Sequence, residues 1–175
     1  MQSKVLIISF LAIWLLVGCG SAPDTETPEL NLSNVQTILP TVDPSAAANY
    51  AQIADEDTLA LGQSVYEANC ASCHGINGEG QFPDAPMQPD DTGRIGAPPH
   101  NSNGHTWHHD DDLLYDIVRN GGKGTPDRFY PMPAFGEQLS DDEIIAVIEY
   151  IKTMWSEEER FIQAERTLTV REQNQ

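Results

Sequence analysis

The stretch Cys70-Ala71-Ser72-Cys73-His74 decides how the rest of the chain is interpreted. Two cysteines two residues apart, followed directly by histidine, are typical of a c-type haem attachment site, because each thiol can add to a haem vinyl group and the histidine can ligate the iron. A zinc site built on two CxxC pairs needs a second such pair, which the sequence lacks, and a thioredoxin-like dithiol needs a βαβ pattern around it. We therefore expect one covalently bound haem c, held by Cys70 and Cys73, with His74 as an axial iron ligand.

The N-terminal residues are typical of an export signal. Residues 5–17 form an apolar run of 13 residues, which is short for a membrane span and fits the hydrophobic region of a signal peptide. The run ends in Leu-Val-Gly-Cys, which resembles the bacterial lipoprotein box. This resemblance implies that residues 1–18 are a signal peptide and that Cys19 carries lipid. The alternatives are a signal peptide that happens to end near a cysteine or an uncleaved anchor, and both also place the domain outside the cytoplasm.

Charge limits the partners of the chain. It carries 9 Lys and Arg against 27 Asp and Glu, a net charge of −18. Nucleic acid and anionic membrane surfaces are poor partners for such a chain. Redox proteins with basic docking surfaces would be attracted to it, although the same charge could serve solubility alone. We therefore expect that the chain does not bind nucleic acid and that it contacts a membrane only through the N-terminal lipid. The oligomeric state stays open.

The regions on either side of the haem motif differ in character. Residues 19–54 lack apolar periodicity and contain four prolines among Ser, Thr and acidic residues, which predicts a flexible tether. Order is expected from residue 55, where Asp55 or Asp57 can cap a helix that carries Leu61, Val65 and Tyr66 toward the core. Residues 75–96 have no sustained period and predict a long loop beside the haem.

Two further helices are predicted after the motif. Asp110 is the expected N-cap of a short helix that ends at Gly121, and residues 124–136 form a second loop. Ser140 and Glu143 make a capping box for the next helix. Its apolar stripe has helical spacing and contains Ile144, Val147, Ile148, Ile151 and Trp155. Residues 156–175 predict a polar helical extension and tail.

Residues 55–155 resemble a class I type monohaem cytochrome c domain. The resemblance rests on Gly62 and Tyr66, on the motifs CASCHG at 70–75 and PMPAFG at 131–136, and on Tyr150 and Trp155 of the last helix. It implies an all-α cytochrome c fold, a small helical domain wrapped around one haem. It also implies that the first and last helices of the domain cross at Gly62.

The resemblance also implies site residues. His74 and Met132 are the implied axial ligands, and the carbonyl of Pro98 is implied to orient His74. Prolines on both sides of Met132 stiffen its loop, which suits a weak thioether ligand. Met87, which follows a proline, and the histidines are alternative distal ligands; the histidines concerned are His100, His105, His108 and His109.

The histidine-rich stretch allows two interpretations. His105, His108 and His109 have the spacing that would place them on one helical face, as a copper or zinc site requires. They precede the predicted cap at Asp110, however, so capping, packing of Trp107 on the haem edge, or hydrogen bonding to a haem propionate is the alternative.

A Met/His ligand pair fills both axial positions and leaves none open for oxygen, which favours electron transfer over catalysis. We therefore expect a lipid-anchored one-electron carrier that works between redox partners outside the cytoplasm. One alternative is a fixed electron-entry haem subunit of a larger membrane oxidase or dehydrogenase complex. Another is a haem or metal sensor that uses the histidine cluster.

Overall fold

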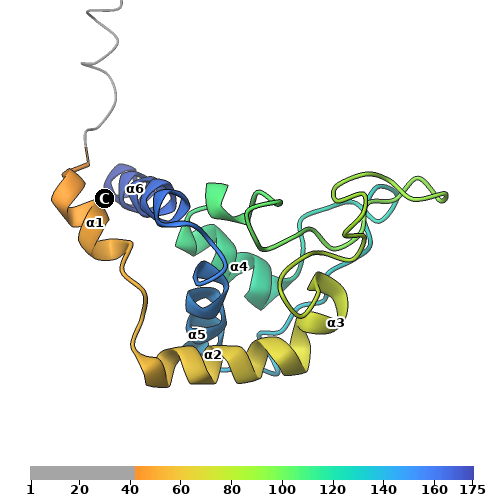
Figure 1. Cartoon of the computed structure of the whole chain (residues 1–175), viewed down its shortest axis with the longest axis horizontal. Helices are drawn as coiled ribbons and strands as arrows, with labels where there is room; N and C mark the ends of the chain where they lie inside the picture. Colours follow the sequence, from red (N-terminus) through yellow and green to blue (C-terminus); the bar gives the residue numbers. More distant parts are fainter. Residues whose placement is uncertain (1–41) are drawn as a thin grey trace, which may run out of the picture. The chain divides into compact units, whose positions relative to one another are not determined.

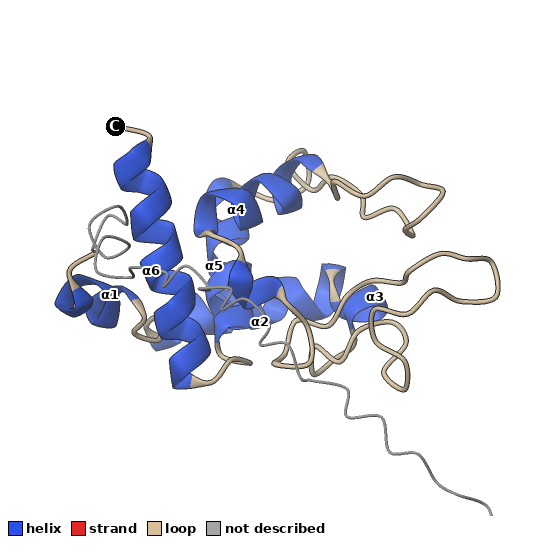
Figure 2. Ribbon diagram, turned by 90° about the horizontal axis from the view of Figure 1, so that it is seen from above, coloured by secondary structure: helices blue, strands red, loops and turns tan. Residues whose placement is uncertain are grey.

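The structure is a computed structural model that describes residues 42–175. The signal peptide, Cys19 and the tether up to residue 41 lie outside the described residues. Within 42–175 there are helices and isolated β-bridges but no strand, as expected for an all-α fold (Figure 2). The helices are α1 (Pro44–Tyr50), α2 (Glu56–Asn69), α3 (Ala71–His74), the 3-10 helix η2 (Thr106–His108), α4 (Asp111–Asn120), α5 (Asp141–Lys152) and α6 (Glu157–Gln173).

The predicted helix starts are present. Asp55, rather than Asp57, caps α2 and accepts a hydrogen bond from the backbone N–H of residue 58. Asp110 caps α4 in the same way. Ser140 and Glu143 form the predicted capping box at the start of α5. Each cap satisfies a backbone N–H group that has no partner inside its helix, which fixes where the helix begins.

The crossing of α2 and α5 organises the core (Figure 1). A Cβ atom on Gly62 would lie 2.0 Å from the carbonyl oxygen of Ala146, so only glycine allows this approach. Val65 and Tyr66 of α2 are buried, whereas Leu61, which we expected to face the core, is 40% exposed. The reason is that Gly62 points at α5, which turns the preceding residue away from the contact.

A second helix pair lies to one side of the crossing helices. Residues 44–50, which we expected in the tether, form α1 and lie beside α6 (Figures 1 and 2). Ala47 and Ala164 are fully buried where the two helices meet, and Val42 and Phe161 pack around them. A seven-residue helix shows too few turns for a periodic pattern, and its partner lies more than 100 residues away, so the sequence alone did not reveal this contact.

A partly buried carboxylate holds this pair to the core. Asp111 at the start of α4 accepts hydrogen bonds from Tyr50 of α1 at 2.7 Å, from Lys152 of α5 at 3.0 Å and from Gln163 of α6 at 2.7 Å. One side chain therefore joins four helices. Lys152 is only 5% exposed, and Asp111 gives its ammonium group the partner that a buried charge requires.

Within residues 42–175, none of the helices combines the length and the apolar content that a membrane span requires.

Candidate haem-binding site

The haem motif forms one tight turn at the end of α2. Cys70 ends α2 and starts α3, and its carbonyl accepts hydrogen bonds from the N–H groups of Cys73 at 3.1 Å and His74 at 2.9 Å. Cys70 is buried, Cys73 is exposed, and both are free thiols. Burial raises the pKa of the Cys70 thiol to about 11. The turn thus presents two unpaired thiols and an imidazole within five residues.

The side chain of His74 has a defined tautomer. Its Nδ1 atom lies 2.9 Å from the carbonyl oxygen of Pro98, where the resemblance implied such a contact. Because a carbonyl only accepts, Nδ1 must carry the proton, and Nε2 is left with a free lone pair. Burial lowers the pKa of His74, so its imidazole is neutral at pH 7. A neutral, oriented imidazole is the form that ligates iron.

His100, whose role the sequence left open, lies against this ligand. Its ring stacks on the ring of His74. Thr106 donates its hydroxyl proton to the carbonyl of Pro99 at 3.2 Å, so the Nδ1 of His100, 3.1 Å from the same hydroxyl oxygen, must be the donor in that contact. Trp155 donates to the carbonyl of His100 at 2.7 Å. No sequence pattern around residue 100 indicated this stacking.

Trp107 carries the one buried side-chain polar atom of the described residues that lacks a hydrogen-bond partner, its Nε1. The rest of the side chain packs against the core. An unsatisfied buried donor is costly, so an acceptor is expected at this position. A haem propionate has the chemistry of that acceptor. The residues present therefore fit a haem: two free thiols, an oriented imidazole and a buried donor that needs an anionic or carbonyl partner.

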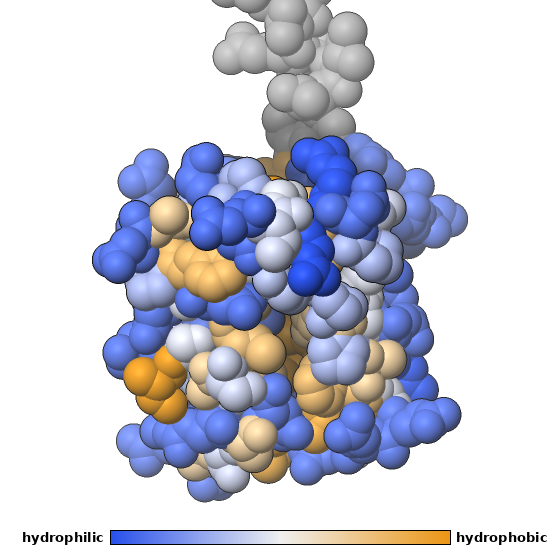
Figure 3. Space-filling model, turned by 90° about the vertical axis from the view of Figure 1, so that its right-hand side faces the viewer, coloured by the Kyte–Doolittle hydropathy of each residue, from blue (hydrophilic) through white to orange (hydrophobic). Residues whose placement is uncertain are grey.

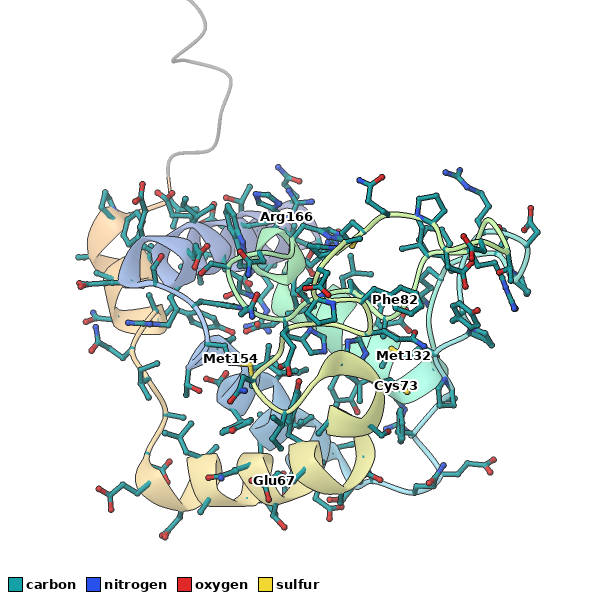
Figure 4. All side chains as sticks on the ribbon, turned by 45° about the vertical axis from the view of Figure 1, so that its right-hand side comes forward. Glu67, Cys73, Phe82, Met132, Met154 and Arg166 are labelled. Carbon is teal, nitrogen blue, oxygen red and sulfur yellow. The ribbon has the colours of Figure 1, made fainter. Side chains whose placement is uncertain are left out.

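Met132 lies in a loop that is fixed to the end of α4. Its carbonyl accepts a hydrogen bond from Gly122 N–H at 3.1 Å, and further on Phe135 N–H donates to the carbonyl of Val118 at 3.0 Å. The side chain is partly buried against the core. In Figure 4, Met132 and Cys73 appear on one side of the view, and Met154, in the turn after α5, appears apart from them.

The other candidate ligands have different surroundings. Met87 lies in the loop after the motif with a positive φ of 64°, a backbone conformation that non-glycine residues rarely adopt. His105 and His108 are exposed, and His108 rests against the ring of Trp107. Over residues 42–175, no three His, Cys, Asp or Glu side chains converge as a metal site would require. The structure therefore gives no support to the copper or zinc interpretation.

Figure 3 shows the surface that carries the two long loops. Apolar side chains gather around a hollow in the middle of this face, and polar side chains surround them. An apolar cleft with a polar rim is the usual form of a cofactor site.

Comparisons with known proteins indicate a cytochrome c domain. Residues 57–151 match the family model described as cytochrome c oxidase, cbb3-type, subunit III. The chain is 30% identical over 101 residues to the cbb3-type cytochrome c oxidase subunit CcoP of Azospirillum sp. (strain B510), covering 58% of this chain and 30% of that protein. It is 33% identical over 107 residues to the gluconate 2-dehydrogenase cytochrome c subunit of Pantoea cypripedii, covering 57% and 21%.

A smaller relative is covered almost completely. The chain is 31% identical over 96 residues to cytochrome c6 of Chlorolobion braunii, which covers 55% of this chain and 90% of that protein. The chain thus spans a third or less of the two larger relatives. No solved structure matches it. A cytochrome c domain binds haem c covalently and transfers electrons rather than catalysing a reaction of its own. The chain belongs to the family of cytochrome c domains that is described as cytochrome c oxidase, cbb3-type, subunit III.

Proposed function

We propose that the chain is a membrane-anchored one-electron carrier with a single haem c that works between redox proteins outside the cytoplasm. When bound, haem c supplies the one-electron couple of its iron. The observation that carries the proposal is the contact of His74 Nδ1 with Pro98, which leaves one ring nitrogen free in a neutral, buried imidazole.

The chain's own residues divide the work of holding the haem. Cys70 and Cys73 would supply the two thiols for covalent attachment, and His74 would supply a ring nitrogen as an iron ligand. Met132 would supply a second ligand, a thioether sulfur, which is supported by its position in a loop that is hydrogen-bonded to the end of α4. If His74 and Met132 both ligate the iron, the bound haem would offer no open site for a substrate, which supports the role of a carrier.

The sequence and the position of α1 support the proposed anchoring and partners. Lipid on Cys19 would hold the protein at a membrane, and only residues before Val42 can act as the tether, because α1 packs against α6. The net charge of −18 favours partners with basic docking surfaces.

The near-infrared sulfur-to-iron charge-transfer band of the oxidised protein tests this proposal, because the band requires a methionine ligand. We expect the full-length holoprotein in detergent to show the band, Met132→Ala to lack it, and Met87→Ala to keep it as the matched control. A wild-type protein without the band would contradict the ligand assignment and bring the sensor alternative forward. In that case the reduced protein should bind carbon monoxide.

A second candidate, a fixed subunit of a larger complex, is favoured by the names of two relatives, which are a subunit of an oxidase and a subunit of a dehydrogenase. Extraction from the native membrane in mild detergent separates the two functions. A carrier should elute alone in size-exclusion chromatography, whereas a fixed subunit should co-elute with the same large partners at every ionic strength.

A further inference from the structure

The two loops that follow the haem motif and α4 are joined at Ile95. The N–H of Ile95 donates to the carbonyl of Arg128 at 2.8 Å, and the carbonyl of Ile95 accepts from the N–H of Tyr130 at 3.0 Å. These two bonds form an isolated parallel β-bridge between Ile95 and Phe129. The bridge connects the first loop to the second at Phe129, three residues before Met132.

Side chains of the first loop surround the ring of Tyr130. The Tyr130 hydroxyl donates to Oδ2 of Asp90 at 2.7 Å. The guanidinium of Arg94 lies over the same ring, 4.2 Å from its centroid, and the ring of Phe82 contacts it edge-on. Figure 4 shows Phe82 on the same side of the view as Cys73 and Met132. Tyr130 is thus held at its hydroxyl by Asp90 and at its ring by Arg94 and Phe82, and all of these partners belong to one loop.

Hydrogen bonds within its own loop orient the Asp90 carboxylate toward the Tyr130 hydroxyl. Its Oδ1 accepts hydrogen bonds from the N–H and the hydroxyl of Thr92, at 2.8 Å and 2.7 Å, and from the N–H of Arg94 at 3.2 Å. These bonds fix the carboxylate and leave Oδ2 for Tyr130. Hydrogen bonds from Thr92 and Tyr130 hold the pKa of Asp90 well below its usual range, so the acceptor is charged at neutral pH. Hydrogen bonds to charged acceptors are stronger than neutral ones.

The same segment continues to the proximal ligand. Three residues after Ile95, the carbonyl of Pro98 lies 2.9 Å from Nδ1 of His74. Between them, Ala97 exchanges two hydrogen bonds with Gln81, both at 3.0 Å. Two consecutive prolines then restrict the backbone. Residues 95–98 therefore form a short braced segment with the proximal histidine at one end and the loop of Met132 at the other.

We infer that Tyr130 is a positioning residue, which keeps Met132 at the distal side of the haem through its hydrogen bond to Asp90 and through the bridge at Ile95. This inference rests on the proposed function, in which Met132 is the distal ligand. A thioether is a weak ligand, so its retention depends on how firmly its loop is held. Releasing the loop lets an external ligand take its place more readily.

Imidazole competition measures this restraint. The full-length ferric holoprotein in detergent is titrated with imidazole, and the Kd is obtained from the loss of the near-infrared charge-transfer band. We expect Tyr130→Phe to bind imidazole about tenfold more tightly than wild type, because opening the loop no longer breaks a hydrogen bond to a charged acceptor. Asp90→Asn should also tighten binding. The double variant should bind imidazole no more tightly than the stronger single variant, because both act through one bond.

Tyr50→Phe is the matched control. Tyr50 also donates to an aspartate oxygen at 2.7 Å and also lies near cationic side chains, but its partner is Asp111 beside α1 and α6. We expect it to leave the Kd for imidazole unchanged.

The possible outcomes distinguish failure of this inference from failure of the proposed function. A wild type that shows the band, combined with equal Kd values for wild type and Tyr130→Phe, overturns the inference and leaves the proposed function standing. Equal tightening in Tyr130→Phe and Tyr50→Phe also overturns it, because the effect would then be a general loss of stability. A wild type that lacks the band overturns the assignment of Met132 and the inference together.

Discussion

The imidazole ring of His100 lies on the imidazole ring of His74, with ring centroids 4.0 Å apart and planes 19° apart. His74 is the proposed proximal ligand, so a second imidazole forms part of its immediate surroundings. The polarity around a metal ligand tunes the reduction potential, because polar neighbours favour the oxidised state, which carries the larger charge.

Replacing His100 should therefore change the potential in a defined direction. His100→Leu removes a polar neighbour of His74 and should raise the reduction potential by about 30 mV, equivalent to about 0.7 kcal/mol for a one-electron couple. Spectroelectrochemical titration at pH 7 measures the shift. His105→Leu is the control, because His105 is exposed. The reduction potential of this variant should equal that of wild type. A lower potential in His100→Leu would contradict the explanation.

Gly62→Ala should damage the helix crossing. The added Cβ would meet the carbonyl oxygen of Ala146 at 2.0 Å, so the helices must separate. We expect the free energy of unfolding to fall by about 3 kcal/mol. Gly93→Ala is the comparison, because nothing lies within 4 Å of its Cβ and only its positive φ resists substitution, which should cost about 1 kcal/mol. Denaturant unfolding followed by circular dichroism distinguishes the two, and equal losses would argue against a steric contact at the crossing.

Ala47→Asp should detach α1 from α6. Ala47 is fully buried against α6, so a carboxylate there loses water without gaining a partner. We expect a loss of about 2 kcal/mol in the free energy of unfolding, with no change in the haem absorption spectrum. Ala48→Asp makes the same chemical change at the next residue, which is exposed, and should be near neutral. If both variants match wild type, α1 does not contribute to stability.

Asp112→Asn should show a pH-dependent loss of stability. A side-chain hydrogen bond from Arg171 lowers the pKa of Asp112 below 3.8. The unfolded chain therefore binds this proton at a higher pH than the folded protein does, so the contribution is present above pH 3.8 and is lost as the pH falls below it. Because the pair is largely exposed, we expect a difference of about 0.5 kcal/mol at pH 7 that shrinks in high salt. Urea unfolding of both proteins between pH 7 and pH 3 provides the measurement. A difference that grows in acid would contradict the assigned pair.

Trp107→Phe tests whether the unpartnered indole faces a haem propionate. A hydrogen bond to a carboxylate stabilises its charged form, so removing the donor should raise the pKa of that propionate. The pH at which the reduction potential starts to change should move upward by about one unit. Potentials measured from pH 4 to pH 9 in both proteins give this value. An unchanged pH profile would mean that the indole has another acceptor.

Local features of the site and fold could be predicted because they depend on residues close together in the chain. The spacing of Cys70, Cys73 and His74 places three groups on one helical turn, and the capping box of Ser140 and Glu143 spans a single turn. Such contacts repeat wherever the same spacing occurs, so their meaning does not depend on the rest of the molecule.

The tertiary structure alone decided what joins these local features. Tyr50 and Asp111 are 61 residues apart, and Tyr130 and Asp90 are 40 residues apart, so no periodic pattern links either pair. The helix α1 was missed because a short helix gains its stability from a partner distant in sequence. The haem motif and the ends of the main helices were thus determined by the sequence itself. Folding decided the stacking of His100 on His74, the packing of α1 against α6 and the β-bridge at Ile95. Each of these contacts needs two segments distant in the sequence to meet with matched shape and charge.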